Sequence, residues 1–244
     1  MPPDNSTDGQ SNPATHAMNL TLFDLDNTLI ATDSDYEWGQ FLIARGIVDR
    51  AEYESRNNRF FEDYKSGTLD IHAYLTFALE PLARHPRAQL DAWHQQFMAE
   101  VITSAIGPAA RQLVQSHLDA GDLVCCVTAT NAFVTAPIAR AFGIPHLIAA
   151  EAEEVDGRFT GRPTGIPSFQ EGKIKRVDLW LAGMGKTMAD FARSTFYSDS
   201  RNDIPLLERV TDPVAVDPDQ TLRHLAHERG WRIITLRDAE NQPA

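Results

Sequence analysis

Short apolar runs alternate with segments of helical periodicity from Gly107 onward, and this alternation limits the possible folds more than any other feature. The predicted strands lie at residues 20–25, 123–127, 147–149, 195–197, 214–216 and 232–236. The predicted helices between them lie at residues 107–120, 132–142, 173–181, 204–210 and 222–229. Regular alternation of strand and helix is typical of a parallel sheet covered by helices on both faces. We therefore expect an α/β protein with a doubly wound parallel sheet.

The stretch between the first predicted strand and Gly107 interrupts this alternation. Its apolar residues recur at spacings of three and four, with no strand-like run among them. Glycine and proline breaks divide it into four predicted helices. We therefore predict an α/β core that carries an inserted all-helical cap domain. The predicted boundaries are 18–31 and 105–240 for the core and 32–104 for the cap.

A hairpin and a loop are expected between the predicted strand at 147–149 and the helix at 173–181. Asp156-Gly157 separates two short runs, 153–155 and 158–160, and this dipeptide is typical of a two-residue hairpin turn. The following segment, 161–167, contains two glycines and two prolines and is predicted to be a loop.

The beginning of the chain and its cysteines indicate a cellular location. Residues 1–17 have no large apolar side chain after Met1, so we expect a disordered leader that lacks the apolar centre of a signal peptide. Cys125 and Cys126 are adjacent in an apolar run, where successive side chains point to opposite faces, so free thiols are expected. No apolar stretch reaches the roughly 18 residues of a membrane span. The sequence predicts a cytoplasmic protein without a membrane partner.

The charge balance excludes one class of partner. The chain carries 34 acidic and 22 basic residues, for a net charge of -12. Such a chain repels phosphate backbones at long range, so nucleic acid is not an expected partner. The sequence leaves the oligomeric state open.

Acidic and hydroxyl residues follow several predicted strands directly. Because ligands of a doubly wound sheet bind beyond the carboxyl ends of its strands, we expect these residues to converge. They are Asp24, Asp26 and Thr28 after the first strand, Thr128 after the second, Lys173 at a helix start, and Asp199 and Asp203 after a later strand. Converging carboxylates repel one another unless a cation joins them, and oxygen ligands suit Mg²⁺. A lysine and a metal beside a carboxylate nucleophile would make a site for a phosphate ester.

Each of these residues also has a structural interpretation. Aspartates cluster in turns, Thr128 would cap a helix, Lys173 would lie on a helix surface, and Asp199 and Asp203 would favour a helix N-terminus. A calcium loop of EF-hand type is a further alternative for Asp24 and Asp26. It fails because Leu29 stands where that loop requires glycine.

The ordered set of motifs resembles the haloacid dehalogenase superfamily, and specifically its phosphoserine-phosphatase-like phosphatases of subfamily IB. Residues 24–28 match the DxDxT signature, Thr128 matches the second motif, Lys173 the third, and Asp199 with Asp203 the acidic fourth. The match covers nearly all of residues 20–236. It implies a Rossmann-like core with a helical cap of the C1 type over its carboxyl edge.

The resemblance also implies a role for each motif residue. Asp24 would attack phosphorus and form an aspartyl-phosphate, while Asp26 would act as general acid and then as general base. Thr28 and its neighbouring amides, Thr128 and Lys173 would bind the phosphoryl group. The metal site for Mg²⁺ would comprise Asp24, Asp26 through its carbonyl, Asp199 and Asp203. A general base at position 26 favours a phosphatase over an ion pump or a dehalogenase.

The predicted cap supplies candidates for substrate specificity. In phosphoserine phosphatases an acidic residue nine positions after the nucleophile is thought to meet the substrate ammonium, and here that residue is Asp33. Asp33 is equally well placed to cap the first helix of the insert. Arg56 and Arg59 are candidates for a substrate carboxylate or phosphate. Several aromatic residues are expected mostly in the core of the cap, with one or two available to stack on a ring: Tyr36, Trp38, Phe60, Phe61 and Tyr64.

The second motif departs from that of phosphoserine phosphatases, and the departure affects the expected substrate. Those enzymes usually place two glycines after the hydroxyl residue, whereas Thr128 is followed by Ala129-Thr130. Some members of the group resemble histidinol-phosphate phosphatases, and an acidic, aromatic cap would suit an imidazole-bearing amino alcohol. The expected function is hydrolysis of a small phosphate ester such as histidinol phosphate, with phosphoserine as the alternative. Other classes left open are a phosphotransferase and a catalytically idle regulatory or interaction protein on the same fold.

Overall fold

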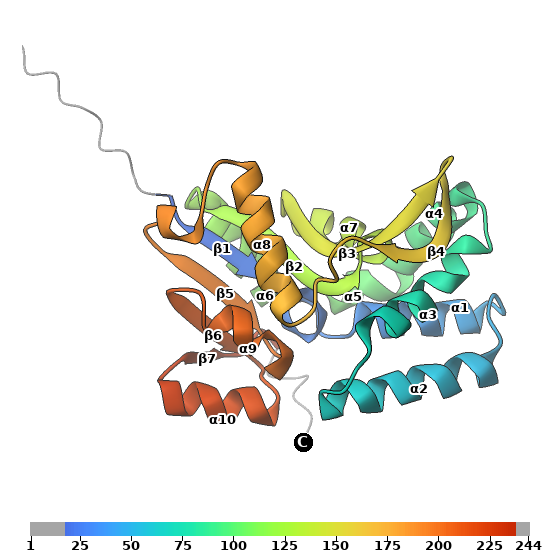
Figure 1. Cartoon of the computed structure of the whole chain (residues 1–244), viewed down its shortest axis with the longest axis horizontal. Helices are drawn as coiled ribbons and strands as arrows, with labels where there is room; N and C mark the ends of the chain where they lie inside the picture. Colours follow the sequence, from blue (N-terminus) through green and yellow to red (C-terminus); the bar gives the residue numbers. More distant parts are fainter. Residues whose placement is uncertain (1–17, 238–244) are drawn as a thin grey trace, which may run out of the picture.

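The computed structural model describes residues 18–237, which form one seven-stranded sheet flanked by helices (Figure 1). The expected leader, residues 1–17, lies outside the described residues. The strands are β1 (Leu20–Phe23), β2 (Leu123–Asn131), β3 (His146–Val155), β4 (Arg158–Thr164), β5 (Ser194–Ser198), β6 (Asp212–Val216) and β7 (Arg232–Ile234). Their order across the sheet is β4-β3-β2-β1-β5-β6-β7, and only β4 runs antiparallel to its neighbour.

Alternation of side chains along the central strands divides the apolar core between the two faces of the sheet. Leu20 and Leu22 of β1 pack in one cluster, whereas Phe23 packs in the other. The helices of this part of the chain are α6 (Pro108–Asp119), α7 (Ala132–Ala141), α8 (Glu171–Gly183), α9 (Ile204–Leu207) and α10 (Gln220–Arg229). Helices α6 and α7 contribute to the cluster of Phe23, and α8, α9 and α10 contribute to the other. The predicted doubly wound parallel sheet is confirmed.

The segment between β1 and α6 is helical, as predicted. Its helices are α1 (Ser34–Ala44), α2 (Arg50–Ser66), α3 (Ile71–Ala83) and α4 (Arg87–Phe97), which continues through the turns η2 (Met98–Ile102) and α5 (Thr103–Ala105). Trp38 of α1 and Phe97 of α4 belong to the same apolar cluster as Val134 and Ile138 of α7. Helices α1 and α4 are therefore packed onto the sheet domain, and a division of the chain into core and cap at residues 32–104 stays a prediction.

Several boundaries differ from the expectation, among them the ends of β1 and β7, which are at Phe23 and Ile234 instead of residues 25 and 236. The hairpin turn at Asp156-Gly157 is present, but the expected loop at 161–167 is wrong up to Thr164, since β4 continues to that residue. Pro163 is tolerated there because β4 is an edge strand, where a missing N–H costs no ladder bond. Strands β2 and β3 are also longer than predicted, and α9 ends at Leu207 instead of residue 210. No helix among residues 18–237 has the length and apolarity needed to cross a membrane.

Candidate active site

Asp24 stands where β1 ends, at the centre of the carboxyl edge of the sheet. Its amide donates to the carbonyl of Tyr197 in the neighbouring strand β5 at 2.9 Å, so the backbone at this point is held by the sheet. The chain then turns sharply through η1 (Leu25–Leu29), where Asn27 takes a left-handed conformation with φ of 55°. The residue Asp24 is 6% exposed. A carboxylate is thus buried at the edge where ligands of such a sheet bind.

Lys173, in the first turn of α8, lies between two carboxylates. Its Nζ donates to Asp24 Oδ1 at 2.8 Å and to Asp203 Oδ2 at 2.7 Å, and its side chain is buried. Ser198 Oγ donates to the same oxygen of Asp203 at 2.7 Å. Burial alone would lower the pKa of Lys173, but the adjacent carboxylates of Asp203 and Asp24 raise it above its ordinary value. The lysine is therefore a fixed positive charge beside Asp24.

The carboxylate of Asp26 is held by three donors. Its Oδ1 accepts from the amide of Ser34 at 2.7 Å, and its Oδ2 accepts from Thr130 Oγ1 at 2.9 Å and Thr128 Oγ1 at 3.2 Å. Burial, together with the charge of Asp33, raises the pKa of Asp26 to about 6. The predicted second-motif residue, Thr128, thus contacts Asp26 in the structure.

Thr28 connects the first and fourth motifs. Its Oγ1 lies 3.1 Å from Asp24 Oδ2 and 3.0 Å from Asp199 Oδ1, and it accepts from the amide of Asp199 at 3.0 Å. A hydroxyl has one proton, so it donates to only one of these carboxylates at a time. Burial and the charges of Asp24 and Asp203 raise the pKa of Asp199 well above its ordinary value. Lys173 alone does not balance the carboxylates of Asp24, Asp199 and Asp203, of which Asp24 and Asp203 are buried, so the donor set fits an added cation.

The contacts of these residues indicate which carboxylates are available to bind Mg²⁺. Asp24 and Asp199 meet around Thr28, whereas the side chain of Asp203 is engaged by Lys173 and Ser198. No three acidic, histidine or cysteine side chains within residues 18–237 form a metal-binding group. The structure therefore does not bring all of the predicted metal residues together as side-chain ligands. Two carboxylates completed by a backbone carbonyl and waters are nevertheless an ordinary environment for Mg²⁺.

A cavity of about 620 Å³ opens over these residues. Its floor consists of motif residues, among them Asp24, Asp26, Thr128, Lys173, Asp199 and Asp203. The helical segment contributes mainly acidic, aromatic and aliphatic side chains, which are Asp33, Glu37, Tyr36, Phe60, Phe61, Tyr64, Leu69, Ile71 and Tyr74. Lys173 is the single basic residue of the lining within the described chain. The cavity is therefore lined by the motif residues at the sheet edge and by acidic and aromatic side chains of the helical segment.

Both interpretations of Asp33 agree with its position. Its Oδ1 accepts from the amides of Asp35 at 2.9 Å and Tyr36 at 3.0 Å, so it caps α1. The same residue lines the cavity. Its contact with a substrate ammonium stays a prediction.

The structure does not bring Arg56 or Arg59 to the cavity. Arg56 is directed toward α3, where its Nη1 pairs with Glu80 at 2.9 Å. Arg59 is exposed and donates to the carbonyl of Ser55 at 3.4 Å. The residues of α2 that line the cavity include Phe60, Phe61 and Tyr64 but neither arginine.

The aromatic residues divide between the core and the cavity. Trp38 is in the core and 1% exposed, as predicted. Tyr36 and Phe61 are 47% and 52% exposed and line the cavity, and their stacking on a ring of the substrate stays a prediction. Two half-exposed rings beside an acidic residue form a surface that a flat, cationic group would contact well.

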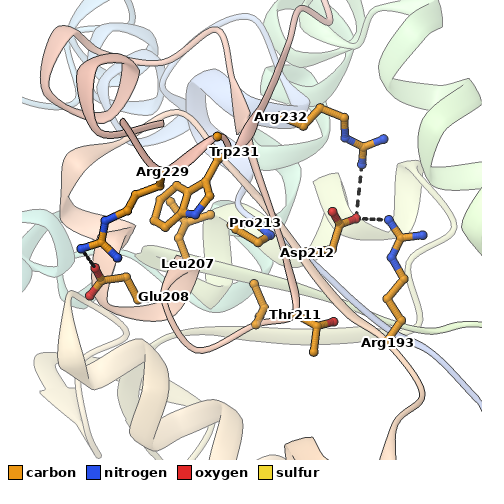
Figure 2. A pocket seen from close by; sticks show the side chains of 11 residues that line it. Arg193, Leu207, Glu208, Thr211, Asp212, Pro213, Arg229, Trp231 and Arg232 are labelled. Atoms are coloured by element: carbon orange, nitrogen blue, oxygen red, sulfur yellow. Dashed lines mark hydrogen bonds and ion pairs between the residues drawn. The ribbon is translucent and has the colours of Figure 1, made fainter. Parts of the chain in front are cut away.

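A second cavity, of about 590 Å³, lies at the opposite edge of the sheet, where β5 and β6 begin (Figure 2). Arg193 and Arg232 pair with Asp212, and Arg229 pairs with Glu208 at 3.3 Å. Its three arginines are thus all paired with its two acidic residues, and it contains no residue of the four motifs.

Two contributors to the site were not expected from the sequence. Thr130 occupies a position where phosphoserine phosphatases usually have glycine, and its hydroxyl donates to Asp26. Glu37 lines the cavity and accepts from Thr32 Oγ1 at 3.0 Å. The position of Glu37, one helical turn after Asp33, is the signal that would have identified it, because residues four apart share a helix face.

Comparisons with known proteins agree with this geometry. A family model described as haloacid dehalogenase-like hydrolase matches residues 21–208. A Neisseria meningitidis protein named histidinol-phosphatase is 49% identical over 220 residues, which cover 90% of this chain and 99% of that protein. A Mycobacterium tuberculosis protein named phosphoserine phosphatase is 37% identical, with 89% of this chain and 71% of that protein covered.

Solved structures give the same picture of the fold. A protein of unknown function from Bordetella pertussis Tohama I is 52% identical with a TM-score of 0.85, over 89% of this chain and 98% of that one. A substrate-bound phosphoserine phosphatase is 19% identical with a TM-score of 0.65, over 91% of this chain and 95% of that one. The second likeness concerns the fold alone.

Proposed function

Because the chain belongs to the haloacid dehalogenase-like hydrolase family, we propose that it is a phosphomonoesterase in which Asp24 is the nucleophile. The observation that carries this proposal is the contact between Asp24 Oδ1 and Lys173 Nζ at 2.8 Å on the cavity floor. Burial raises the pKa of Asp24, and the buried lysine opposes this effect by favouring the ionised carboxylate. The same lysine would attract the anionic phosphoryl group.

The proposed reaction has two steps. In the first, a carboxylate oxygen of Asp24 bonds to phosphorus, the bond from phosphorus to the substrate oxygen breaks, and Asp26 gives its proton to the leaving alcohol. In the second, Asp26 takes a proton from water, the water oxygen bonds to phosphorus, and the bond to Asp24 breaks to release phosphate. Contacts from Ser34, Thr128 and Thr130 keep Asp26 in position for both transfers.

Mg²⁺ is the proposed cofactor, held by Asp24 and Asp199 with the carbonyl of Asp26, and when bound it would neutralise charge on the phosphoryl oxygens. Lys173 pairs with Asp24 and Asp203, and the Thr28 hydroxyl lies between Asp24 and Asp199, so three neighbouring carboxylates share one paired lysine, which supports this proposal.

Histidinol phosphate is the proposed substrate. It carries an ammonium and an imidazole but no carboxylate, and the cavity offers it the carboxylates of Asp33 and Glu37 and the rings of Tyr36 and Phe61. A substrate carboxylate would meet no free cation in the described lining, since Lys173 is already paired with two aspartates. The name of the Neisseria relative supports the same substrate.

Phosphoserine is the second candidate. It is favoured by the place of Asp33, which lines the cavity nine residues after Asp24, and by the name of the Mycobacterium relative. Its carboxylate is the feature that the cavity does not accommodate.

Cys125 and Cys126 are buried free thiols, which supports the cytoplasm as the proposed location.

Replacement of the nucleophile tests the chemistry. Asp24→Asn should lower kcat on p-nitrophenyl phosphate with Mg²⁺ by at least about 1000-fold while the far-ultraviolet circular dichroism is unchanged. Asp91→Asn, at an exposed helix residue paired with Arg87, is the matched control and should retain activity. Full activity of Asp24→Asn would rule out the mechanism.

A substrate panel tests the specificity. Phosphoserine and serinol phosphate differ only in a carboxylate that becomes a hydroxymethyl group. We expect kcat/KM to be highest for histidinol phosphate, and serinol phosphate to exceed phosphoserine by about 10-fold or more. A preference for phosphoserine over serinol phosphate would contradict the substrate proposal and leave the phosphatase chemistry intact.

A further inference from the structure

The guanidinium of Arg237 binds residues 27–30 of the loop that follows Asp24, although Arg237 lies far from this loop in the sequence. Its Nη1 donates to the carbonyl of Thr28 at 3.3 Å, and its Nη2 donates to the carbonyls of Ile30 at 3.2 Å and of Asn27. The side chain is 17% exposed. Three carbonyls of one loop are thus held by a single residue more than 200 positions away in the sequence.

This loop requires an external partner because it is not a regular helix. Asp26 has ψ of 131° and Asn27 has φ of 55°, so helical hydrogen bonding is interrupted within η1. Arginine suits the role, since its planar guanidinium carries several donors in a fixed arrangement. A lysine at the same place would offer a point charge without that geometry.

Arg237 is itself held from behind by Asp217, which follows β6. Asp217 Oδ2 lies 3.9 Å from Arg237 Nε and accepts from the amide of Leu236 at 3.0 Å. The amide of Asp217 donates to the carbonyl of Ile234 at 3.0 Å. The guanidinium is therefore connected to the sheet through two of its strands.

The contacts bear on the site through Thr28. The carbonyl of Asn27 belongs to the peptide plane before Thr28, and the carbonyl of Thr28 belongs to the plane after it. Because peptide units are planar, anchoring both carbonyls restricts φ and ψ of Thr28. The side chain of Thr28 is stiff about χ1, so the direction of its hydroxyl is set as well. That hydroxyl is the group that touches Asp24 and Asp199.

We propose that Arg237 is a positioning residue for the phosphatase reaction: by holding the carbonyls of Asn27, Thr28 and Ile30, it keeps the Thr28 hydroxyl and the Asp26 carboxylate in place beside Asp24. The inference rests on the proposed function for its effect on catalysis. Its effect on the loop itself does not depend on any activity.

The test compares Arg237→Ala with the wild type and with Arg229→Ala, a control that loses an exposed ion pair to Glu208 instead. Arg237→Ala should lower kcat about 10- to 100-fold with KM nearly unchanged, because a displaced catalytic group costs rate more than binding. Millimolar guanidinium should restore part of the lost kcat in Arg237→Ala and should not raise that of the wild type or of Arg229→Ala. Hydrogen exchange of the amides of residues 25–30 should accelerate in Arg237→Ala, while that of α10 stays unchanged.

Other outcomes would overturn the inference. If Arg237→Ala has the kcat of the wild type and the same hydrogen exchange at residues 25–30, Arg237 is not a positioning residue. The role is also excluded if the loss of activity equals the fraction of unfolded protein and guanidinium restores none of it. If Arg237→Ala does not fold, Asp217→Asn is the second variant, because it removes the carboxylate that supports the guanidinium. It should lower kcat and accelerate exchange by less than Arg237→Ala would. An Asp217→Asn variant that behaves as the wild type would overturn the proposed role of Arg237. An inactive wild type would disprove the proposed function, and exchange at residues 25–30 would still decide the role of Arg237 in the loop.

Discussion

Lys173 determines the charge balance of the site at the scale of single residues. It is 3% exposed and lies between the carboxylates of Asp24 and Asp203. Removing one partner of such a buried group leaves an uncompensated charge, which is far more costly than any surface ion pair. Lys173 is therefore essential to both the fold and the site, and its replacement alone would not separate the two roles.

Thr130 offers a cleaner separation, because its hydroxyl contacts Asp26 and its side chain carries no charge. We expect Thr130→Ala to lower kcat about 10-fold, since Asp26, the proposed general acid and base, loses one of its three donors. Thr130→Ser retains the hydroxyl and should retain most of the activity. Steady-state kinetics on p-nitrophenyl phosphate with Mg²⁺ give the comparison. Equal activity of the alanine and serine variants would show that the hydroxyl does not contribute.

The motif residues could be predicted from the sequence, whereas their partners could not. Asp24, Asp26 and Thr28 are close in the chain, a strand-end position located Thr128, and a helix start together with the order of the motifs located Lys173. The contacts of Thr130 and Arg237 depend on which oxygen or carbonyl a side chain reaches after folding. No local spacing determines such contacts, because they join segments that are far apart in the sequence.

Helix α2 is the least anchored element of the helical segment. None of its residues is buried. It reaches the sheet domain through Tyr64, whose Oη lies 2.8 Å from Ser200 Oγ, and through the carbonyl of Lys65, which accepts from Arg201 at 3.3 Å. An element with few buried contacts opens at low free energy, so α2 is the part of the segment best suited to admit substrate.

Helix α4 is anchored by a buried histidine instead. His94 Nε2 lies 2.8 Å from the carbonyl of Val134 in α7, and the ring packs against Trp38, Phe97 and Phe133. A neutral imidazole protonated on Nε2 satisfies this carbonyl. Burial lowers the pKa of His94 below its ordinary value of 6.5, an effect to which Arg140 adds.

This histidine predicts a pH-dependent contribution to stability. Below pH 6.5 the unfolded chain binds a proton at His94 that the folded chain does not. The free energy of unfolding therefore decreases as the pH is lowered. The stability difference between the wild type and His94→Gln should therefore shrink between pH 7.5 and pH 5. Urea unfolding of both proteins at each pH measures it. A constant difference would show that His94 has the same pKa in both states.

At the scale of elements, periodicity predicted the helices and strands well but not the ends of strands. β2 and β3 continue past their apolar runs, because polar residues such as Asn131 and Glu151 are still paired with a neighbouring strand. Pairing with a neighbouring strand, which the local sequence does not specify, extends them.

The whole molecule carries excess negative charge, and part of that excess is buried at one point. Asp24 and Asp203 pair with a single lysine, and the Thr28 hydroxyl lies between Asp24 and Asp199, in a chain of net charge -12. Repulsion within this cluster lowers stability unless a cation is bound. The cluster thus links the stability of the molecule to its proposed cofactor.

Thermal unfolding should show this link. Mg²⁺ at about 100 times its Kd stabilises a folded state by about 2.7 kcal/mol. For a chain of this size that is a rise in Tm of about 5 to 10 °C. Asp199→Asn should raise Tm without Mg²⁺, because it removes a repelling charge, and should lose most of the rise on adding Mg²⁺. Asp178→Asn, at an exposed position of α8, is the control and should respond as the wild type does. An undiminished Mg²⁺ effect in Asp199→Asn would contradict the proposed ligand set.

The sequence by itself determined the class of fold and the residues of the four motifs, because periodicity and strand-end position are local properties. Only the tertiary structure decided that Arg56 and Arg59 lie away from the cavity, that Tyr36 and Phe61 line it, and that Arg237 binds the loop after Asp24. These outcomes depend on how helices are rotated about their axes and on which distant segments meet. Packing of the whole chain sets both, since no short stretch of sequence contains the partners that compete for each side chain.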